Sequence, residues 1–254
     1  MKQTRLLMGM PITVEIVERD MPVTPDDLEQ VFAYFASVDA MFSTYKETSE
    51  ISQINRGELL APAYSEQMQT ILALSAQTKQ ETQGYFNIQH NGVSDPSGIV
   101  KGWAIHNVAH MLQDRGLRHF FIDAGGDIQV AGKNTHGDLW RIGIRNPFNR
   151  TENVKILALT DCGVATSGTA IRGQHVYDPY NPNVPILDIV SLTVIGPNIY
   201  EADRFATAAF AMRSQGIQFI EQLTGFEGYM IDAQAMATLT SGFERYVLQK
   251  LWKR

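Results

Sequence analysis

The sequence is poor in cysteine and in long apolar runs. Cys162 is the single cysteine among 254 residues, so the chain cannot form an intramolecular disulfide or build a cysteine zinc site on its own. The apolar stretch at residues 6–10 is interrupted by Gly9 and followed by Pro11, and no run approaches the roughly 20 residues that cross a bilayer. We therefore expect no membrane insertion, and we expect the protein in the cytoplasm.

Positive charge and nucleotide fingerprints are also scarce. The chain has 21 lysines and arginines against 27 acidic residues, a formal net charge of −6, which gives no large basic surface for a nucleic-acid backbone. No two glycines form a G-x-G pair, so the dinucleotide signature of a Rossmann enzyme is missing. Residues 126–133 are one residue too long for a P-loop, and Asn134 stands where Ser or Thr would hold magnesium. These absences disfavour a nucleic-acid partner, a nicotinamide enzyme and a P-loop enzyme.

Two histidines have the spacing of metal ligands. His106 and His110 are four residues apart on a predicted helix, so they face the same side, as zinc ligands do. The sequence offers neither the HExxH glutamate nor a recognisable third ligand. We interpret the pair as surface histidines.

Three segments have apolar residues at helical spacing. The first follows Thr24, which offers a capping hydroxyl before a proline and two acids. The second begins near Ser65 and stops at Gly84. The third runs over residues 98–113, with Gly116 placed as its terminator. The sequence therefore predicts three amphipathic helices in its first half.

The remaining segments predict an α+β fold. Helical spacing returns over residues 201–212 and 217–223, and late strands are predicted at 229–231 and 246–248. Because helices and strands are segregated, we expect a mostly antiparallel sheet with flanking helices. Without a linker or a repeat, residues 1–254 predict a single compact domain. The other β-type runs lie between Gly, Asp and Asn turns at residues 12–16, 120–123, 128–130, 139–144, 154–159 and 189–195.

Two polar segments carry groups suited to a planar or anionic ligand. Tyr45 lies in a polar loop, where an aromatic ring either stacks on a planar ligand or packs on its own turn. Residues 95–104 form a turn that begins a helix, and Lys101 lies one turn into it. Free N–H groups and the helix dipole would face an anion there, although an ordinary capped helix has the same pattern.

Two further segments suggest a close backbone approach and a cation. Gly125 and Gly126 lie between Asp123 and Asp127, so the backbone there can approach a ligand or simply form a tight turn. Asp203 and Thr207 are four residues apart on a predicted helix. Their carboxylate and hydroxyl oxygens could bind one hard cation, or Asp203 could cap the helix while Thr207 bonds back to a carbonyl.

The order of these segments along the chain resembles that of a known family. The matching segments span residues 8 to about 212. They are Met8-Gly9-Met10-Pro11, Ser43-Thr44-Tyr45, Gly84-Tyr85-Phe86-Asn87, Ser97-Gly98-Ile99-Val100-Lys101-Gly102, residues 123–127, Val164-Ala165-Thr166-Ser167-Gly168, His175-Val176-Tyr177-Asp178-Pro179 and residues 202–207. Together they resemble the FAD:protein FMN transferase family, often called the ApbE family.

The resemblance implies a fold with T-fold-like halves and a magnesium-dependent reaction. Enzymes of this kind cleave FAD, link its FMN half through a phosphoester bond to a Thr or Ser of an acceptor flavoprotein, and release AMP. Attack by a hydroxyl on the FMN-side phosphorus spreads negative charge over oxygens that a cation can stabilise.

The resemblance also assigns roles to residues of this chain. His175 is the implied general base. The carbonyl of Gly98, the carboxylate of Asp203 and the hydroxyl of Thr207 are the implied magnesium ligands. The implied FAD-binding residues are Met8, Tyr45, Tyr85, Phe86, Asn87, Asp95, Lys101 and Val176.

The sequence departs from the family pattern near the predicted base. Asn181 and Pro182 replace the usual Thr-Gly after Asp178, and residues 88–100 form a shorter connection than usual. These departures leave open an FAD-binding protein without transferase activity and an FAD pyrophosphatase that gives FMN and AMP. An unrelated hydrolase that uses Asp178 and His175 is a third alternative.

Overall fold

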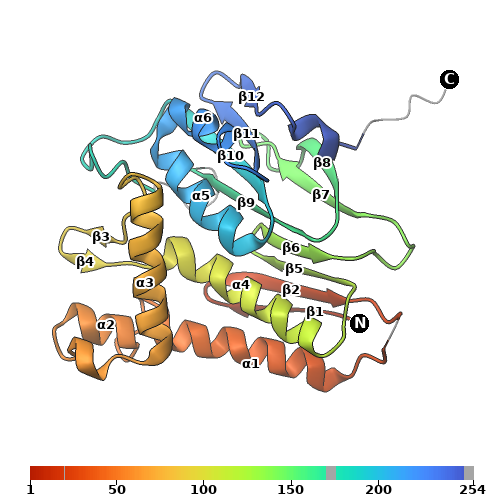
Figure 1. Ribbon diagram of the computed structural model, residues 1–254, viewed down its shortest axis with the longest axis horizontal. Coiled ribbons are helices and arrows are strands. Elements are labelled where there is room, and N and C mark those ends of the chain that lie inside the picture. The colour runs from red at the N-terminus through yellow and green to blue at the C-terminus, as the bar shows by residue number, and fades with distance from the viewer. Residues whose placement is uncertain (20, 170–175, 249–254) are drawn as a thin grey trace.

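An eight-stranded antiparallel sheet forms the centre of the molecule (Figure 1). The computed structural model describes residues 1–19, 21–169 and 176–248. The strand order is β1-β2-β5-β6-β9-β10-β11-β12. The bounds are β1 Lys2–Leu7, β2 Met10–Ile16, β5 Phe120–Ala124, β6 Asp127–Ala131, β9 Cys162–Gly168, β10 Ile189–Gly196, β11 Glu227–Asp232 and β12 Ala237–Leu239.

Two small hairpins and six α-helices complete the described part of the chain. The hairpins are β3 Gln89–His90 with β4 Val93–Ser94, and β7 Trp140–Arg145 with β8 Asn153–Leu159. The helices are α1 Pro25–Phe42, α2 Glu50–Asn55, α3 Glu66–Glu81, α4 Ser97–Asp114, α5 Ile199–Ala211 and α6 Gly216–Glu221. Strands and helices are segregated along the chain, and the sheet is antiparallel, so the α+β prediction is confirmed.

The long helices begin where the sequence provides caps. Thr24 and Asp27 form a capping box at α1, in which Thr24 N–H donates to Asp27 Oδ2 at 2.8 Å. Ser65 Oγ accepts a hydrogen bond from Met68 N–H at the start of α3. None of the helices in residues 1–19, 21–169 and 176–248 combines the length and apolar character that a membrane span requires.

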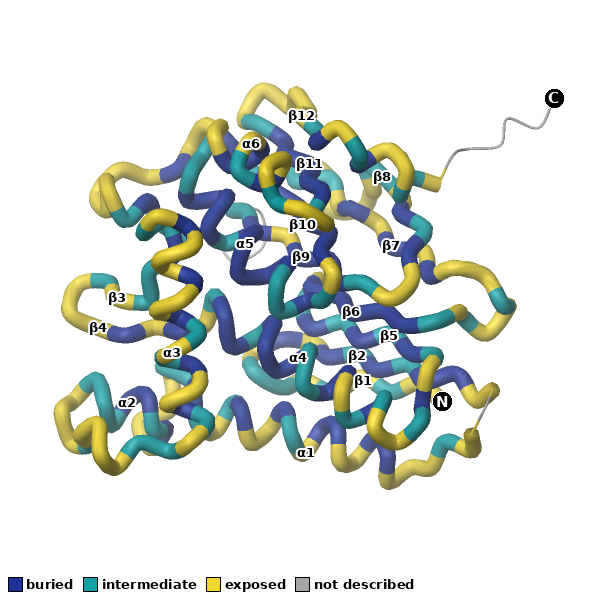
Figure 2. The backbone as a smooth tube through the Cα atoms, in the orientation of Figure 1, coloured by how far each residue is buried: buried dark blue, intermediate teal, exposed yellow. Residues whose placement is uncertain are grey.

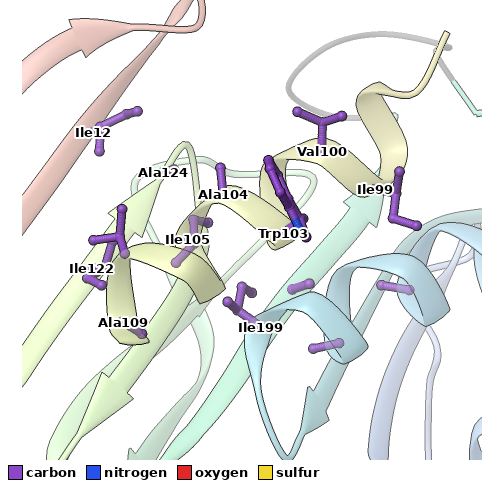
Figure 3. Close-up of a cluster of buried hydrophobic side chains, with 14 of the residues drawn as sticks. Ile12, Ile99, Val100, Trp103, Ala104, Ile105, Ala109, Ile122, Ala124 and Ile199 are labelled. Carbon is purple, nitrogen blue, oxygen red and sulfur yellow. The ribbon is translucent and has the colours of Figure 1, made fainter. Parts of the chain in front are cut away.

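The sheet carries a hydrophobic core on each of its two faces. The larger core lies between the strands and the helices α1, α4, α5 and α6, and Figure 2 shows α5 and the central strands as mostly buried. In Figure 3, side chains of α4 gather with Ile12 of β2, Ile122 of β5 and Ile199 of α5. A second core beneath the hairpin β7–β8 includes Trp140 and Leu157. The sheet therefore separates a helical layer from a smaller β layer.

Most predicted elements occur near their expected positions, and a few differ. The prediction omitted the strands β1, β3, β4, β9 and β12 and the short helix α2. A strand at 246–248 was wrong, because a 3-10 turn covers Phe243–Tyr246 and only Val247 forms a bridge, to Leu157 of β8. Burial of Phe243 in the second core fixes that turn instead.

Candidate functional site

A cleft of about 660 Å³ opens at one end of the sheet. Its walls come from the segment after α3, the first turn of α4, the end of β9, α5 and the loop before β10. Its lining includes Tyr85, Phe86, Asn87, Asp95, Gly98, Lys101, Thr166, Val176, Asp203 and Thr207. Nine of the predicted site residues are in this list, so the fold brings together segments that lie far apart in the sequence.

The helices α4 and α5 cross closely at the base of this cleft. A Cβ atom on Gly98 would lie 3.2 Å from Thr207 Cγ2, and one on Gly102 would lie 2.7 Å from Asp203 Cβ. Only glycine leaves room for this approach. The α5 face that carries Asp203 and Thr207 therefore lies directly against the first turn of α4, as the predicted cation site requires.

A lysine lies between two buried carboxylates at this crossing. Lys101 Nζ forms an ion pair with Asp127 Oδ2 and lies 3.9 Å from Asp203 Oδ1. Asp203 Oδ2 accepts a hydrogen bond from Gly102 N–H at 2.8 Å, and Asp127 Oδ1 accepts one from Thr166 N–H at 3.1 Å. Among the described residues, two carboxylates thus face Lys101 at this crossing, and both are buried.

This environment raises the pKa of Asp203 to about 7. Burial is the main cause; the positive charge of Lys101 opposes it, and the nearby Asp127 adds to it. The ionised form of the Asp203 carboxylate is therefore unfavourable on its own, and a bound cation would stabilise it. Among the described residues, no three His, Cys, Asp or Glu side chains group as metal ligands. Asp203 and Asp127 are the carboxylates at this crossing, and hydroxyl and carbonyl oxygens would add to them in binding a cation.

The wall opposite the helices is built by aromatic side chains. The Tyr177 hydroxyl donates to the carbonyls of Asn87 and Gln89, at 2.9 Å each, and its ring lies 4.0 Å from that of His90, centroid to centroid. Tyr85 contacts Tyr180 edge to face, with ring centroids 5.0 Å apart. These contacts fix the short segment after α3 against the loop before β10.

Two predicted flavin-binding residues do not line the cleft. Met8 lies in the turn between β1 and β2 with a φ of 52°. Tyr45 lies between α1 and α2 with 98% of its surface exposed. No ring or side chain of the described chain covers Tyr45, and its role in stacking stays a prediction. His175, the predicted base, lies outside the described residues.

Asp178 stabilises its own loop through hydrogen bonds. Its carboxylate accepts hydrogen bonds from Tyr180 N–H and Asn181 Nδ2 at 2.9 Å each, and Arg213 Nε lies 3.8 Å away. These contacts use the Asp178 carboxylate to hold its own loop in place. Asp178 therefore gives no support to the alternative of a hydrolase.

The histidine pair on α4 is close but lies apart from the cleft lining. His106 Nε2 and His110 Nε2 are 3.0 Å apart. Burial, with a smaller effect of His110, lowers the pKa of His106 to about 4. His106 is therefore neutral near pH 7.

Sequence reasoning missed several residues that shape the site. It placed Asp127 in a glycine turn but did not pair its carboxylate with Lys101. It also missed Tyr177, His90 and Thr166 as lining residues. The second acid of the Asp123–Asp127 turn was a usable signal, since an acid after paired glycines is available to a nearby cation.

Comparison with known proteins identifies the family. The ApbE family model matches residues 8–96 and 89–230. An FAD:protein FMN transferase of Salmonella typhimurium is 29% identical over 146 residues, which cover 54% of this chain and 42% of that protein. One of Vibrio cholerae is 33% identical over 127 residues, covering 46% and 38%. The chain thus aligns with less than half the length of these curated relatives.

Solved structures share the whole fold. A flavin transferase ApbE from Vibrio cholerae superposes with a TM-score of 0.84 at 21% identity, over 97% of this chain and 98% of that one. An ApbE protein from Thermotoga maritima gives a TM-score of 0.85 at 18% identity, over 98% and 99%. Because the ApbE family model matches most of this chain, the chain belongs to the ApbE family.

Proposed function

We propose that the protein is an FAD:protein FMN transferase, which cleaves FAD and links FMN through a phosphoester bond to a Thr or Ser of an acceptor flavoprotein. The observation that carries this proposal is the α4–α5 crossing, where Gly98 and Gly102 meet Thr207 and Asp203 beside Lys101. The names of the curated relatives support the same activity.

The donor set at the crossing fits magnesium. Asp203 supplies a buried carboxylate and Thr207 a hydroxyl, both on the α5 face that lies against α4. Gly102 N–H donates to Asp203 Oδ2 at 2.8 Å. The Gly98 carbonyl oxygen has two lone pairs and can accept another ligand. Hard oxygen atoms are the ligands that Mg²⁺ prefers, and bound Mg²⁺ supplies positive charge beside a diphosphate.

The chain's own residues then bind and orient FAD. Lys101 provides a further positive charge for the diphosphate at the start of α4, where the helix dipole is also favourable. Tyr85, Phe86 and Asn87 provide an aromatic and polar wall for part of the nucleotide. His175 is the predicted base that accepts the proton of the attacking hydroxyl.

A direct assay tests the proposal. Purified protein is incubated with FAD and either Mg²⁺ or EDTA, and AMP is measured by chromatography. We expect AMP release that requires Mg²⁺, with FMN retained covalently when an acceptor flavoprotein is present and released free when water attacks. FAD recovered intact under all conditions would leave an FAD-binding protein, and no affinity for FAD would end the proposal.

A further inference from the structure

A second cleft lies on the opposite face of the sheet. It has a volume of about 310 Å³ and is bounded by β7 on one side and by β5, β6, β9 and β10 on the other. Lys101 and Thr166 line both this cleft and the larger one. The two clefts therefore meet at these two residues.

A gap in the sheet explains how they meet. Strand β6 pairs with β9 from Val130–Cys162 to Ile128–Val164, and the pairing stops there. Beyond it β9 continues to Gly168, and among the residues that the structure describes this part of β9 pairs with β10 alone. Thr166 N–H consequently donates to the carboxylate of Asp127. Lys101 forms an ion pair with Asp127 where the β6–β9 pairing ends, so the diphosphate site proposed above lies next to the place where the two clefts share their lining.

The second cleft carries more basic than acidic side chains in an acidic protein. Its described lining contains three arginines, Arg141, Arg145 and Arg150, and one acidic residue, Asp123, besides Lys101, whose charge is paired with Asp127, whereas the chain has a net charge of −6. Burial raises the pKa of Asp123 above its ordinary value.

Two of the arginines stand in a row on β7. Arg141 and Arg145 flank Gly143, and all three are exposed in a strand that otherwise alternates with buried residues. Within residues 1–19, 21–169 and 176–248, neither guanidinium forms a salt bridge. Across from them lie Thr166, Ser191 and Thr193, and the Thr166 and Thr193 hydroxyl oxygens are 2.8 Å apart in a mutual hydrogen bond. Such a cleft suits an extended polypeptide that carries negative charge.

We propose that this second cleft receives the acceptor segment, and that Arg141 and Arg145 bind carboxylate side chains close to its target Thr or Ser. The inference rests on the proposed function. The acceptor hydroxyl oxygen forms a bond to the FMN-side phosphorus, and the bond from that phosphorus to the bridging oxygen breaks. AMP leaves with the bridging oxygen, and the hydroxyl proton passes to the base. FAD occupies the larger cleft, and the acceptor approaches through the gap beside Thr166.

Charge-swapped variants and peptides test this arrangement. The probes are fluorescent peptides with one threonine flanked by two aspartates, two asparagines or two lysines. Peptide binding is measured by fluorescence anisotropy, and FMN transfer by mass spectrometry. The protein is tested as wild type, as Arg141→Glu/Arg145→Glu, and as Arg118→Glu, a control at an exposed arginine outside both cleft linings.

We expect the wild type to bind and label the aspartate peptide at least tenfold better than the asparagine peptide. The double variant should lose this preference and gain affinity for the lysine peptide, which a general loss of structure would not produce. Its AMP release from FAD with water as acceptor should stay within about twofold of the wild type. Arg118→Glu should behave as the wild type does.

Three results would overturn the inference. Equal binding of all three peptides by the wild type would remove the charge preference. Loss of FAD binding or of water-dependent AMP release in the double variant would assign the arginines to FAD. AMP release by the wild type without labelling of any peptide would place the acceptor elsewhere. Failure of the proposed function is distinct, because the wild type would then release no AMP while peptide binding remains measurable.

Discussion

At the residue scale, the site depends on an imbalance of buried charge. Asp127 and Asp203 face Lys101, and only Asp127 forms a close ion pair with it. Burying a carboxylate without a full partner is unfavourable, as the raised pKa of Asp203 reflects. A divalent cation beside Asp203 would restore the balance, which makes this residue the most sensitive test of the cation site.

Replacing Asp203 by asparagine should abolish magnesium-dependent AMP release while preserving the fold. The amide oxygen can still accept the hydrogen bond from Gly102 N–H, and the buried charge is removed. We expect a loss of about 100-fold or more in AMP release, with a thermal unfolding midpoint close to that of the wild type. Asp114→Asn, at the exposed end of α4, is the control. Wild-type turnover by the Asp203 variant would refute the cation site.

Tyr45 tests the predicted stacking on the flavin. Because 98% of its surface is exposed, Tyr45→Ala should leave the free energy of unfolding within about 0.5 kcal/mol of the wild type. If the ring stacks on isoalloxazine, FAD affinity should fall by roughly fivefold, since such stacking contributes on the order of 1 kcal/mol. Tyr45→Phe should retain the affinity. Equal FAD titration curves for Tyr45→Ala and wild type would remove Tyr45 from the site.

The sequence predicted residues that line the larger cleft, but it did not predict the ion pairs between them. Asp203 and Thr207 came from helical spacing, because residues four apart share a helix face. The ion pair between Lys101 and Asp127 could not be predicted from spacing, because it joins the start of α4 to the tip of the β5–β6 hairpin. Such a contact depends on tertiary packing, which no local spacing encodes.

At the element scale, β9 is one of the strands that the sequence prediction missed, and it packs closely against α5. β9 contains Gly163, Ala165 and Gly168, which have low β-propensity and no clear alternation. A Cβ on Gly163 would overlap the backbone of Ile199 at the start of α5. Close packing of α5 thus requires small residues in β9, and those residues conceal the strand pattern.

The crossing of α4 and α5 has the same requirement at Gly102. Alanine is favoured over glycine in a helix by about 1 kcal/mol, yet a Cβ here would lie 2.9 Å from the carbonyl oxygen of Ile199. We expect Gly102→Ala to lower the free energy of unfolding by about 1–3 kcal/mol, because backbone must shift. Gly98→Ala should cost less, since its Cβ would meet only side-chain atoms at 3.2 Å and beyond. Chemical denaturation measures both, and a stabilised Gly102→Ala would contradict the close crossing.

His106 on α4 should make stability depend on pH. Its pKa falls from about 6.5 in the unfolded chain to about 4 in the fold, so the unfolded chain binds more protons between these values. Stability should therefore fall as the pH drops from about 6.5 to about 4, and should be unaffected by this group above that range. After discounting for solvent screening, the loss is on the order of 1 kcal/mol.

A substitution isolates this contribution. His106→Asn should flatten the decline in unfolding free energy between about pH 6.5 and 4. His136→Asn removes an exposed histidine in the turn before β7 and is the control. An identical decline for His106→Asn and wild type would show that another group is responsible.

At the scale of the whole molecule, one sheet serves two cores and two clefts. The larger core lies under the helices and the smaller one under β7–β8. Neighbouring residues of β9 point to opposite faces, so Ala165 belongs to the larger core and Val164 to the smaller. Since the same backbone supports both, unfolding of one core should expose the other. This sharing is the physical basis for the predicted single domain.

The last prediction tests that sharing with a substitution in the smaller core. Phe243 is fully buried there, with its ring 5.3 Å from that of Tyr229 on β11, and neither residue lines the larger cleft. Phe243→Ala should lower the free energy of unfolding by about 3–5 kcal/mol, or roughly 6 °C or more in the unfolding midpoint. Phe148→Ala, at an exposed position, is the control. Because β9, β10 and β11 belong to the sheet that both cores share, loss of packing in the smaller core should also destabilise the helical layer. Calorimetry should therefore show one unfolding transition, with its midpoint at a lower temperature. Two separate transitions, with the helical layer melting at the wild-type temperature, would instead divide residues 1–254 into independent units.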